Sequence, residues 1–449
     1  MQPTPKCTLL KLIAALAMIL VVASVARAAS KYKVLYAFKG GEDGNYPAGS
    51  LVFDSAGNLY GSTIFGGGSQ QYCSGEQEPG CGTIFMLARA SNGGWKESVL
   101  HRFQNDNDTS DGSAPNGALI FDGAGNLYGT TSSGGGSPDQ CSSGAFSGCG
   151  IVFELSPKSS EVWKESVLYR FQISGGGAGP YGGVVFDPAG NLYGTAAAGG
   201  NCCDPIFGWG AGVVFQLTPD SEGWSENVLH SFCEKNKCSD GNAPYSGLYR
   251  APDGTLYGTT SYGGGDAFPC FNLGCGTVFK LMNNSNGSWS EQVLNDFIGR
   301  DGIQPSNTLT ADKDGNLYGT TPVEGAFGEG TVFKLSPTKD GRWNFSVLYN
   351  FDVGYAGSFG SGVVLDNAGN LYGTVPVSGN CGGGGCGLVY KLGPRPKGPW
   401  KYRTIYSFQS SEDGFDPDGT LIIDKAGNLY GTASFGGAGG YGVVFEITP

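Results

Sequence analysis

Cysteines are the side chains in this sequence whose spacing most clearly indicates chemistry. Twelve of the 13 cysteines follow residue 29, and four pairs lie five to eight residues apart within glycine-rich segments. These pairs are Cys73/Cys81, Cys141/Cys149, Cys270/Cys275 and Cys381/Cys386. In an exported chain such close pairs favour local disulfides over zinc thiolates. We therefore expect four loops to be closed by their own disulfide.

The other four cysteines allow several pairings. Cys202 and Cys203 are adjacent, and Cys233 and Cys238 lie in the next glycine-rich segment. A local Cys233–Cys238 bridge, a Cys202–Cys203 link and bridges between the two segments are all compatible with the sequence, which by itself cannot choose among them.

Candidate acids and bases are sparse. The two histidines, His101 and His230, fall in segments expected to form outermost strands, where a structural role is the simpler interpretation. Four loop carboxylates could serve a glycan lyase or hydrolase, but none recurs or pairs: Asp204, Asp266, Glu324 and Glu329. The chain has no G-x-x-x-x-G-K-[ST] phosphate loop and no nucleophile elbow. A bare D-x-x-G-N turn offers calcium few oxygen ligands, so we expect no catalytic residue, metal ion or cofactor.

Aromatic residues in the glycine-rich segments are the candidates for ligand binding. Phe65, Tyr262 and Phe435 each stand five residues after the tyrosine of a repeated motif, and Trp209 lies in a similar segment. Exposed aromatic rings on a rigid scaffold stack on sugars or anchor a protein partner. The alternative interpretation is packing between neighbouring loops.

The repeated motif that positions these residues reads D-x-x-G-N-L-Y-G-T-T in its fullest form. Its seven tyrosines are Tyr60, Tyr128, Tyr193, Tyr257, Tyr318, Tyr372 and Tyr430. Glycine follows each tyrosine and also stands three residues before it, while aspartate stands six residues before it in six copies and Ala251 in the fourth. Asp, Gly and Asn are the residue types of a tight turn between two strands. The motif is therefore predicted to be structural.

Each repeat divides into four short strands. An apolar strand a such as LIFD precedes the turn, NLYGT is strand b, GTVFKL is strand c and WKESVLHRF is strand d. Trp and Phe stand eight residues apart in six copies of strand d, which predicts that both face the same side. The chain after residue 29 begins with a lone strand d, KVLYAF, and ends with a strand c, GVVFEITP. This split predicts an all-β, seven-bladed β-propeller with four antiparallel strands per blade, closed by the N-terminal strand in the last blade.

These motifs resemble the Gloeo/Verruco repeat family, whose tandem repeats carry the pattern NxxGxxYGTT and whose members have varied C-terminal anchors. The resemblance extends over nearly the whole chain after residue 29. It implies an exported repeat protein and supplies no catalytic residues. We expect no C-terminal anchor here.

The first residues indicate export. Lys6 and Lys11 precede and enter an apolar run, and small residues surround a cleavage point near Ala28, so residues 1–28 are predicted to be a signal peptide and residues 29–449 a single domain. A secreted or periplasmic location without membrane insertion follows. The formal net charge of −12 disfavours nucleic acid as a partner, and we expect a monomer.

Long b–c loops and short a–b turns should emerge on opposite faces of such a ring. The residues entering strand a are small: Ser50, Ala118, Gly183, Gly247, Thr308, Gly362 and Thr420. They offer no ring of metal ligands. A constant framework with variable, disulfide-closed loops favours a binding or scaffold module for glycan or protein. An extracytoplasmic glycan lyase or hydrolase and a purely structural envelope protein are the alternatives.

Overall fold

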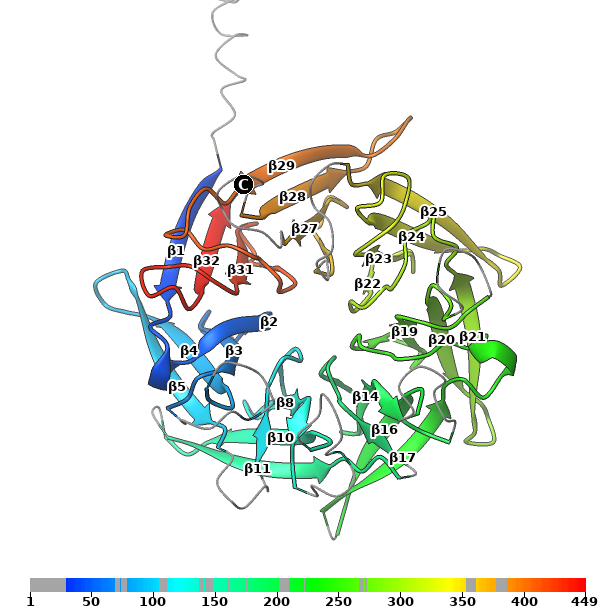
Figure 1. Ribbon diagram of the computed structural model, residues 1–449, viewed down its shortest axis with the longest axis horizontal. Helices are drawn as coiled ribbons and strands as arrows, with labels where there is room; N and C mark the ends of the chain where they lie inside the picture. Colours follow the sequence, from blue (N-terminus) through cyan, green and yellow to red (C-terminus); the bar gives the residue numbers. More distant parts are fainter. Residues whose placement is uncertain are drawn as a thin grey trace, which may run out of the picture.

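Each repeat forms one four-stranded antiparallel sheet, and seven such blades surround a central axis in the computed structural model (Figure 1). The structure describes residues 30–68, 73, 79–104, 111–136, 141, 148–159, 162–174, 176–201, 210–221, 223–265, 270, 273–352, 361–376 and 386–449. The predicted signal peptide lies outside these residues. None of the helices in the described ranges is long and apolar enough to cross a membrane.

The strands follow the predicted order from the axis outward. Blade 1 contains β2 (Asn45–Phe53), β3 (Leu59–Phe65), β4 (Thr83–Arg89) and β5 (Trp95–Arg102); blade 2 contains β7 (Ile120–Phe121), β8 (Leu127–Thr131), β10 (Ile151–Pro157) and β11 (Trp163–Arg170). Blade 3 contains β13 (Val184–Phe186), β14 (Leu192–Ala196), β16 (Val213–Asp220) and β17 (Gly223–Ser231); blade 4 contains β18 (Tyr249–Arg250), β19 (Leu256–Thr260), β20 (Thr277–Asn283) and β21 (Trp289–Asp296). Blade 5 contains β22 (Thr310–Ala311), β23 (Leu317–Thr321), β24 (Thr331–Pro337) and β25 (Trp343–Asn350); blade 6 contains β26 (Val364–Leu365), β27 (Leu371–Val375), β28 (Leu388–Gly393) and β29 (Lys401–Ser407).

Blade 7 closes the ring with both ends of the described chain. It consists of β30 (Ile422–Ile423), β31 (Leu429–Ala433), β32 (Val443–Thr448) and β1 (Lys31–Ala37). β1 pairs antiparallel with β32 from Lys31 opposite Thr448 to Ala37 opposite Val443 (Figure 1). The predicted fold and its mode of closure are confirmed.

The repeated turn satisfies its own polar groups. In blade 1, Oδ1 of Asp54 accepts hydrogen bonds from the backbone N–H groups of Ala56 and Asn58, each at 2.9 Å. Its Oδ2 accepts from the Asn58 side chain at 2.7 Å and from the Tyr60 hydroxyl at 3.1 Å. The same four bonds recur around Asp122, Asp187, Asp312, Asp366 and Asp424. The motif therefore completes a hairpin and leaves its carboxylate fully engaged.

The glycine after each motif tyrosine makes room for the aromatic residue of strand c. A Cβ atom at Gly194 would lie 2.5 Å from the ring of Phe215. The aromatic ring of strand c also packs against the phenylalanine that follows strand d of the preceding blade. These T-shaped contacts occur at all seven blade junctions, with centroids 5.0–5.4 Å apart: Phe38–Phe85, Phe103–Phe153, Phe171–Phe215, Phe232–Phe279, Phe297–Phe333, Phe351–Tyr390 and Phe408–Phe445. An aromatic belt thus joins each blade to the next.

The expectation that Trp and Phe share one face of strand d is wrong. In β11, Trp163 contacts Tyr60 of blade 1, whereas Phe171 contacts Phe215 of blade 3. A β-bulge places Tyr169 and Val167 opposite consecutive residues of β10, so one residue of β11 is left without a partner. The extra residue reverses the alternation of side chains, and strand d therefore contacts both neighbouring blades.

Candidate functional site

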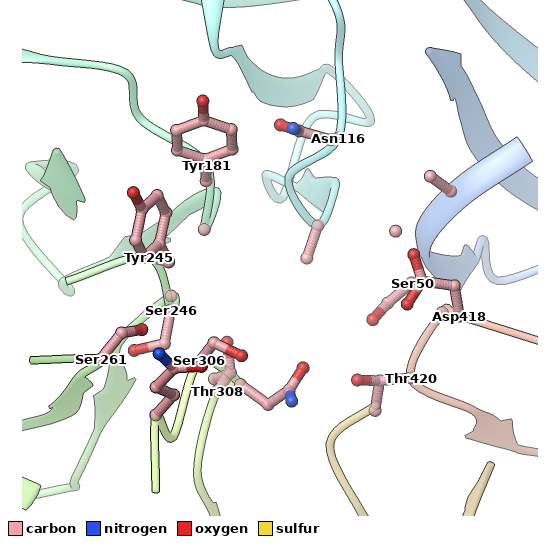
Figure 2. Close-up of a pocket in the computed structure, with 18 of the residues that line it drawn as sticks. Ser50, Asn116, Tyr181, Tyr245, Ser246, Ser261, Ser306, Thr308, Asp418 and Thr420 are labelled. Carbon is pink, nitrogen blue, oxygen red and sulfur yellow. The ribbon is translucent and has the colours of Figure 1, made fainter. Parts of the chain in front are cut away.

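A cavity of about 460 Å³ opens at the ring axis (Figure 2). Its lining comes from blades 1 to 5 and blade 7, mostly from the segments that lead into strand a. Ile64 near the end of β3, and Ser261 and Tyr262 directly after β19, also line it. The cavity therefore lies on the face that carries the b–c loops, which we call the loop face.

Each lining segment has the same backbone design around a proline. The prolines are Pro47, Pro115, Pro180, Pro244, Pro305 and Pro417. The residue before each has a positive φ of 54–66°: Tyr46, Ala114, Gly179, Ala243, Gln304 and Asp416. This left-handed conformation costs a non-glycine residue about 1–2 kcal/mol. A hydrogen bond to the preceding blade offsets part of the cost, as from the N–H of Ala114 to the carbonyl of Cys81 at 3.0 Å.

The residue after the proline is different in nearly every blade. At this position stand Ala48, Asn116, Tyr181, Tyr245, Ser306 and Asp418, and all six line the cavity. The next position stays small where blades crowd together: a Cβ atom at Gly182 would lie 2.1 Å from the backbone nitrogen of Gly247. We call the six proline-containing segments that lead into strand a the inner ring. Their backbone conformation is the same from blade to blade, whereas their side chains vary.

Two tyrosines form one wall of the cavity. The rings of Tyr181 and Tyr245 meet at 65° with centroids 5.2 Å apart, and both side chains are half-buried. Figure 2 shows Asp418 and Ser50 across the cavity from this pair. The walls between them carry hydroxyl and amide groups, including Asn116, whose Oδ1 atom is buried and has no hydrogen-bond partner among the described residues.

Asp418 is the one charged group among the described lining residues. Its side chain is half-buried, and burial, together with the charge of Asp416, raises its pKa to about 7. Burial also raises the pKa of Asp416 to about 6. A wall of hydroxyls, amides and tyrosines with a single carboxyl suits a neutral, polyhydroxylated ligand better than an anion, which needs cationic partners.

A second feature of the loop face is an aromatic cluster where blades 7 and 1 meet. Tyr46 contacts Phe65 edge-on at 5.9 Å and Phe435 at 5.0 Å between ring centroids. Phe435 stacks on Phe415 at 5.1 Å and is 36% exposed. We call Tyr46, Phe65, Phe415 and Phe435 the rim cluster. Ile64 and Ala48, which line the cavity, lie one and two residues from Phe65 and Tyr46, so the backbone of the cluster adjoins the cavity wall.

Comparison with known proteins agrees with this repeat architecture. The model of the Gloeobacter/Verrucomicrobia repeat matches residues 21–269, 207–399 and 269–449. The chain belongs to this family. Among solved structures, the chain is similar to a presumed gluconolactonase at 12% identity and a TM-score of 0.39, covering 94% of this chain and 92% of that one. We draw no argument from so distant a likeness. A search of curated proteins found no match.

Disulfides in this Gloeobacter/Verrucomicrobia repeat protein close loops on the loop face. The structure joins Cys73 to Cys81, Cys141 to Cys149, Cys233 to Cys238 and Cys270 to Cys275. Cys386 is also disulfide-bonded, while Cys381, Cys202 and Cys203 lie outside the described residues. The carbonyls of Cys81, Cys149, Cys275 and Cys386 accept the N–H of the residue before the proline in the next blade. These four cysteines thus fix their loops where the loops support the inner ring, whereas the Cys233–Cys238 bridge lies within a d–a loop. Disulfides of this kind are consistent with an extracytoplasmic location.

The other predicted site residues are divided between the cavity and the periphery. Tyr262 lines the cavity, Phe65 and Phe435 belong to the rim cluster, and Trp209 lies outside the described residues. Phe65 and Tyr262 pair by backbone with residues of the d–a loop, as Phe435 does with Phe415. These backbone contacts hold the two loops of each blade together below their aromatic side chains.

The histidines and loop carboxylates do not reach the cavity in the described structure. His101 and His230 lie in the outer strands, where their Nε2 atoms are 3.4 Å and 3.5 Å from carboxylate oxygens of Asp111 and Asp240. The backbones of Glu324 and Glu329 form an isolated β-bridge within the b–c loop of blade 5. Asp204 and Asp266 lie outside the described residues.

The sequence analysis missed the position that forms the most varied part of the cavity. It considered the residues entering strand a, of which Ser50, Ala118, Gly247, Thr308 and Thr420 do line the cavity. The position two residues earlier contributes both tyrosines and Asp418. The recurring proline was the available signal, because the residue after it varies in size and charge from one blade to the next.

Proposed function

We propose that this protein is an extracytoplasmic binding module that holds a glycan on its loop face. The observation that carries the proposal is the cavity of about 460 Å³ with tyrosine, hydroxyl and amide walls, beside the rim cluster, in which Phe435 is exposed. Sugar-binding sites combine aromatic faces for C–H groups with polar groups for hydroxyls. Both elements occur together here, on the side of the ring that carries the variable loops.

The binding role is favoured over glycan cleavage by the carboxyl groups. Glycosidases use two carboxyl groups on either side of the scissile bond. Of the described residues that line the cavity, Asp418 alone carries a carboxyl group. One carboxyl among many neutral polar groups can orient hydroxyls, and it does not form the acid and base pair.

We also propose that the protein acts outside the cytoplasm as a secreted or periplasmic monomer after removal of residues 1–28. The disulfides support this location because they persist in oxidising compartments. N-terminal sequencing of the exported protein tests the cleavage near Ala28, and a first residue before position 20 would contradict it.

Glycan arrays and pull-down of envelope polysaccharides with the exported protein test the binding role. We expect capture of a defined subset of glycans, weakened at least about tenfold by the double substitution Tyr46→Ala/Phe435→Ala, since each exposed aromatic contact contributes about 1 kcal/mol or more. Val162→Ala is the matched control, because Val162 is 57% exposed in the c–d turn on the opposite face. Capture of envelope proteins but no glycan would identify a protein-binding module instead and contradict the proposal.

A further inference from the structure

We propose that the cavity at the ring axis receives a single terminal pyranose residue of the bound glycan. This inference rests on the proposed glycan-binding function and names the part of the glycan that enters the molecule. The reasons are the chemistry of the two opposite walls of the cavity, its charge and its connection to the rim cluster.

The tyrosine wall suits the apolar face of a sugar ring. Tyr181 and Tyr245 come from adjacent blades and meet edge to face, 5.2 Å apart. Their backbones cannot shift apart easily, because the glycines beside them, Gly182 and Gly247, are packed against each other. A rigid aromatic surface loses little conformational entropy when a ligand packs against it.

The opposite wall suits hydroxyl groups. Asp418, Ser50 and Thr420 lie across the cavity from the tyrosines (Figure 2). A carboxylate can accept two hydroxyl donors at once, and hydrogen bonds to a charged acceptor are stronger than those between neutral groups. Such a wall distinguishes sugars by the positions of their hydroxyls.

The charge of the cavity excludes other small ligands. Its described lining contains no Lys, Arg or His, so phosphates and carboxylates would face Asp418 without a cationic partner. The amide and hydroxyl groups would remain unpaired against a purely apolar ligand, which is unfavourable. A neutral polyol satisfies both walls.

The rim cluster gives the rest of the glycan a path away from the cavity. Ile64 in the cavity wall adjoins Phe65, and Asp418 lies three residues after Phe415. A chain whose last residue occupies the cavity would therefore leave it beside the aromatic rings of blades 7 and 1. The structure thus favours recognition of a chain end over recognition of an internal segment.

Methyl α- and β-glycosides of glucose, galactose, mannose and N-acetylglucosamine are suitable probes, measured with the full chain by saturation-transfer NMR and calorimetry. We expect at least one to bind at a single site and to compete with the captured glycan. Tyr181→Ala and Asp418→Asn should each weaken this binding about tenfold or more. Phe327→Ala, at a 64% exposed aromatic in the b–c loop of blade 5, should leave it unchanged.

Two further readouts separate a role in binding from a loss of folding. Both cavity variants should unfold at the wild-type temperature within a few degrees, and wild-type affinity should vary with pH where Asp418→Asn affinity does not. Glycan capture that persists in both cavity variants, with no competition by any methyl glycoside, would overturn the terminal-pyranose inference and leave the proposed function standing. Absence of binding to both methyl glycosides and glycans would overturn both.

Discussion

The same repeat keeps its side chains constant on one face of the ring and varies them on the other. On the face opposite the loop face, which carries the a–b turns and which we call the turn face, six aspartates make the same four hydrogen bonds within their own hairpins. On the loop face, the residue after the recurring proline changes from alanine to asparagine, tyrosine, serine and aspartate while the backbone around it stays the same. Side chains that repeat have partners inside the repeat. The side chains that vary point to the ring axis, where residues from several blades together form the cavity.

The largest effect should come from crowding the backbone of the inner ring. Gly182→Ala would place a Cβ atom 2.1 Å from the backbone nitrogen of Gly247 and 2.3 Å from the carbonyl carbon of Ser246. We expect a loss of about 3 kcal/mol in the free energy of unfolding, at the upper end for overpacking. Urea denaturation measures it. Gly190→Ala on the turn face is the control: its φ is +89° with no atom within 4 Å of the added Cβ, so it should cost only about 1 kcal/mol. An equal loss of unfolding free energy in the two variants would show that the inner ring is not packed more tightly than the turn face.

Removal of one turn aspartate should have the next largest effect. Asp312→Ala removes the acceptor of the Asp314 and Asn316 amides, the Asn316 side chain and the Tyr318 hydroxyl. We expect a loss of about 2 kcal/mol in unfolding free energy, because several polar groups lose a charged acceptor. Lys313→Ala, at an exposed position of the same turn, should change stability by less than about 0.5 kcal/mol.

Blade 4 allows the reverse experiment, since Ala251 and Thr255 replace the aspartate and asparagine of the motif. The double substitution Ala251→Asp/Thr255→Asn should stabilise the protein by about 1 kcal/mol. A destabilised double variant would mean that the turn of blade 4 has a different conformation from the other six.

The two faces should also respond to pH with opposite signs. Burial alone would raise the pKa of the turn carboxyls, but hydrogen bonds from the asparagine, backbone amides and tyrosine outweigh it and lower the pKa, as at Asp312 and Asp366. Their contribution to stability is therefore complete above their unfolded pKa and is lost as the pH falls through the folded value. Asp418 has a folded pKa raised to about 7, so the folded state binds the extra proton and stability declines as the pH rises through this value.

Thermal unfolding between pH 5 and pH 8 tests the loop-face half of this prediction. Asp418→Asn should remove about 1.5 kcal/mol of the decline in stability over this interval, a value reduced from the full linkage because the Asp418 side chain is partly exposed. Asp424→Asn on the turn face is the control and should leave the slope between pH 5 and pH 8 unchanged, because the pKa of that group is lowered.

The smallest expected effect on stability is the loss of a single tyrosine hydroxyl, which should matter in blade 5 and not in blade 4. Tyr318→Phe removes a hydrogen bond of 2.9 Å to Asp312 and should cost about 1 kcal/mol. Tyr257→Phe in blade 4, where Ala251 provides no carboxylate, should cost less than about 0.5 kcal/mol. Equal losses in the two variants would show that the hydroxyl of Tyr257 has a role outside the turn.

Sequence reasoning identified the blades, their strand order and the closure because each depends on local patterns repeated seven times. The position of Trp163 and Phe171 on opposite sides of β11 could not be obtained in this way, since a bulge adds one residue without a distinctive side chain. The cavity was also missed, although Tyr181 and Asp418 are visible as departures from the repeat. They lie 237 positions apart in the sequence, and only the ring geometry shows that they face each other.

Because β1 pairs with β32, the first strand of the propeller has no partner until the last strand has been made. During synthesis and export, β1 emerges with no partner, and the edge of β31 stays open until Val443–Thr448 arrives. Contacts over such long sequence separations form slowly, so the newly exported chain must be protected from pairing with other chains. A truncated product that lacks β32 keeps two open edges, which cellular proteases and chaperones can detect. Ring closure therefore requires that the chain has been made and exported as far as β32.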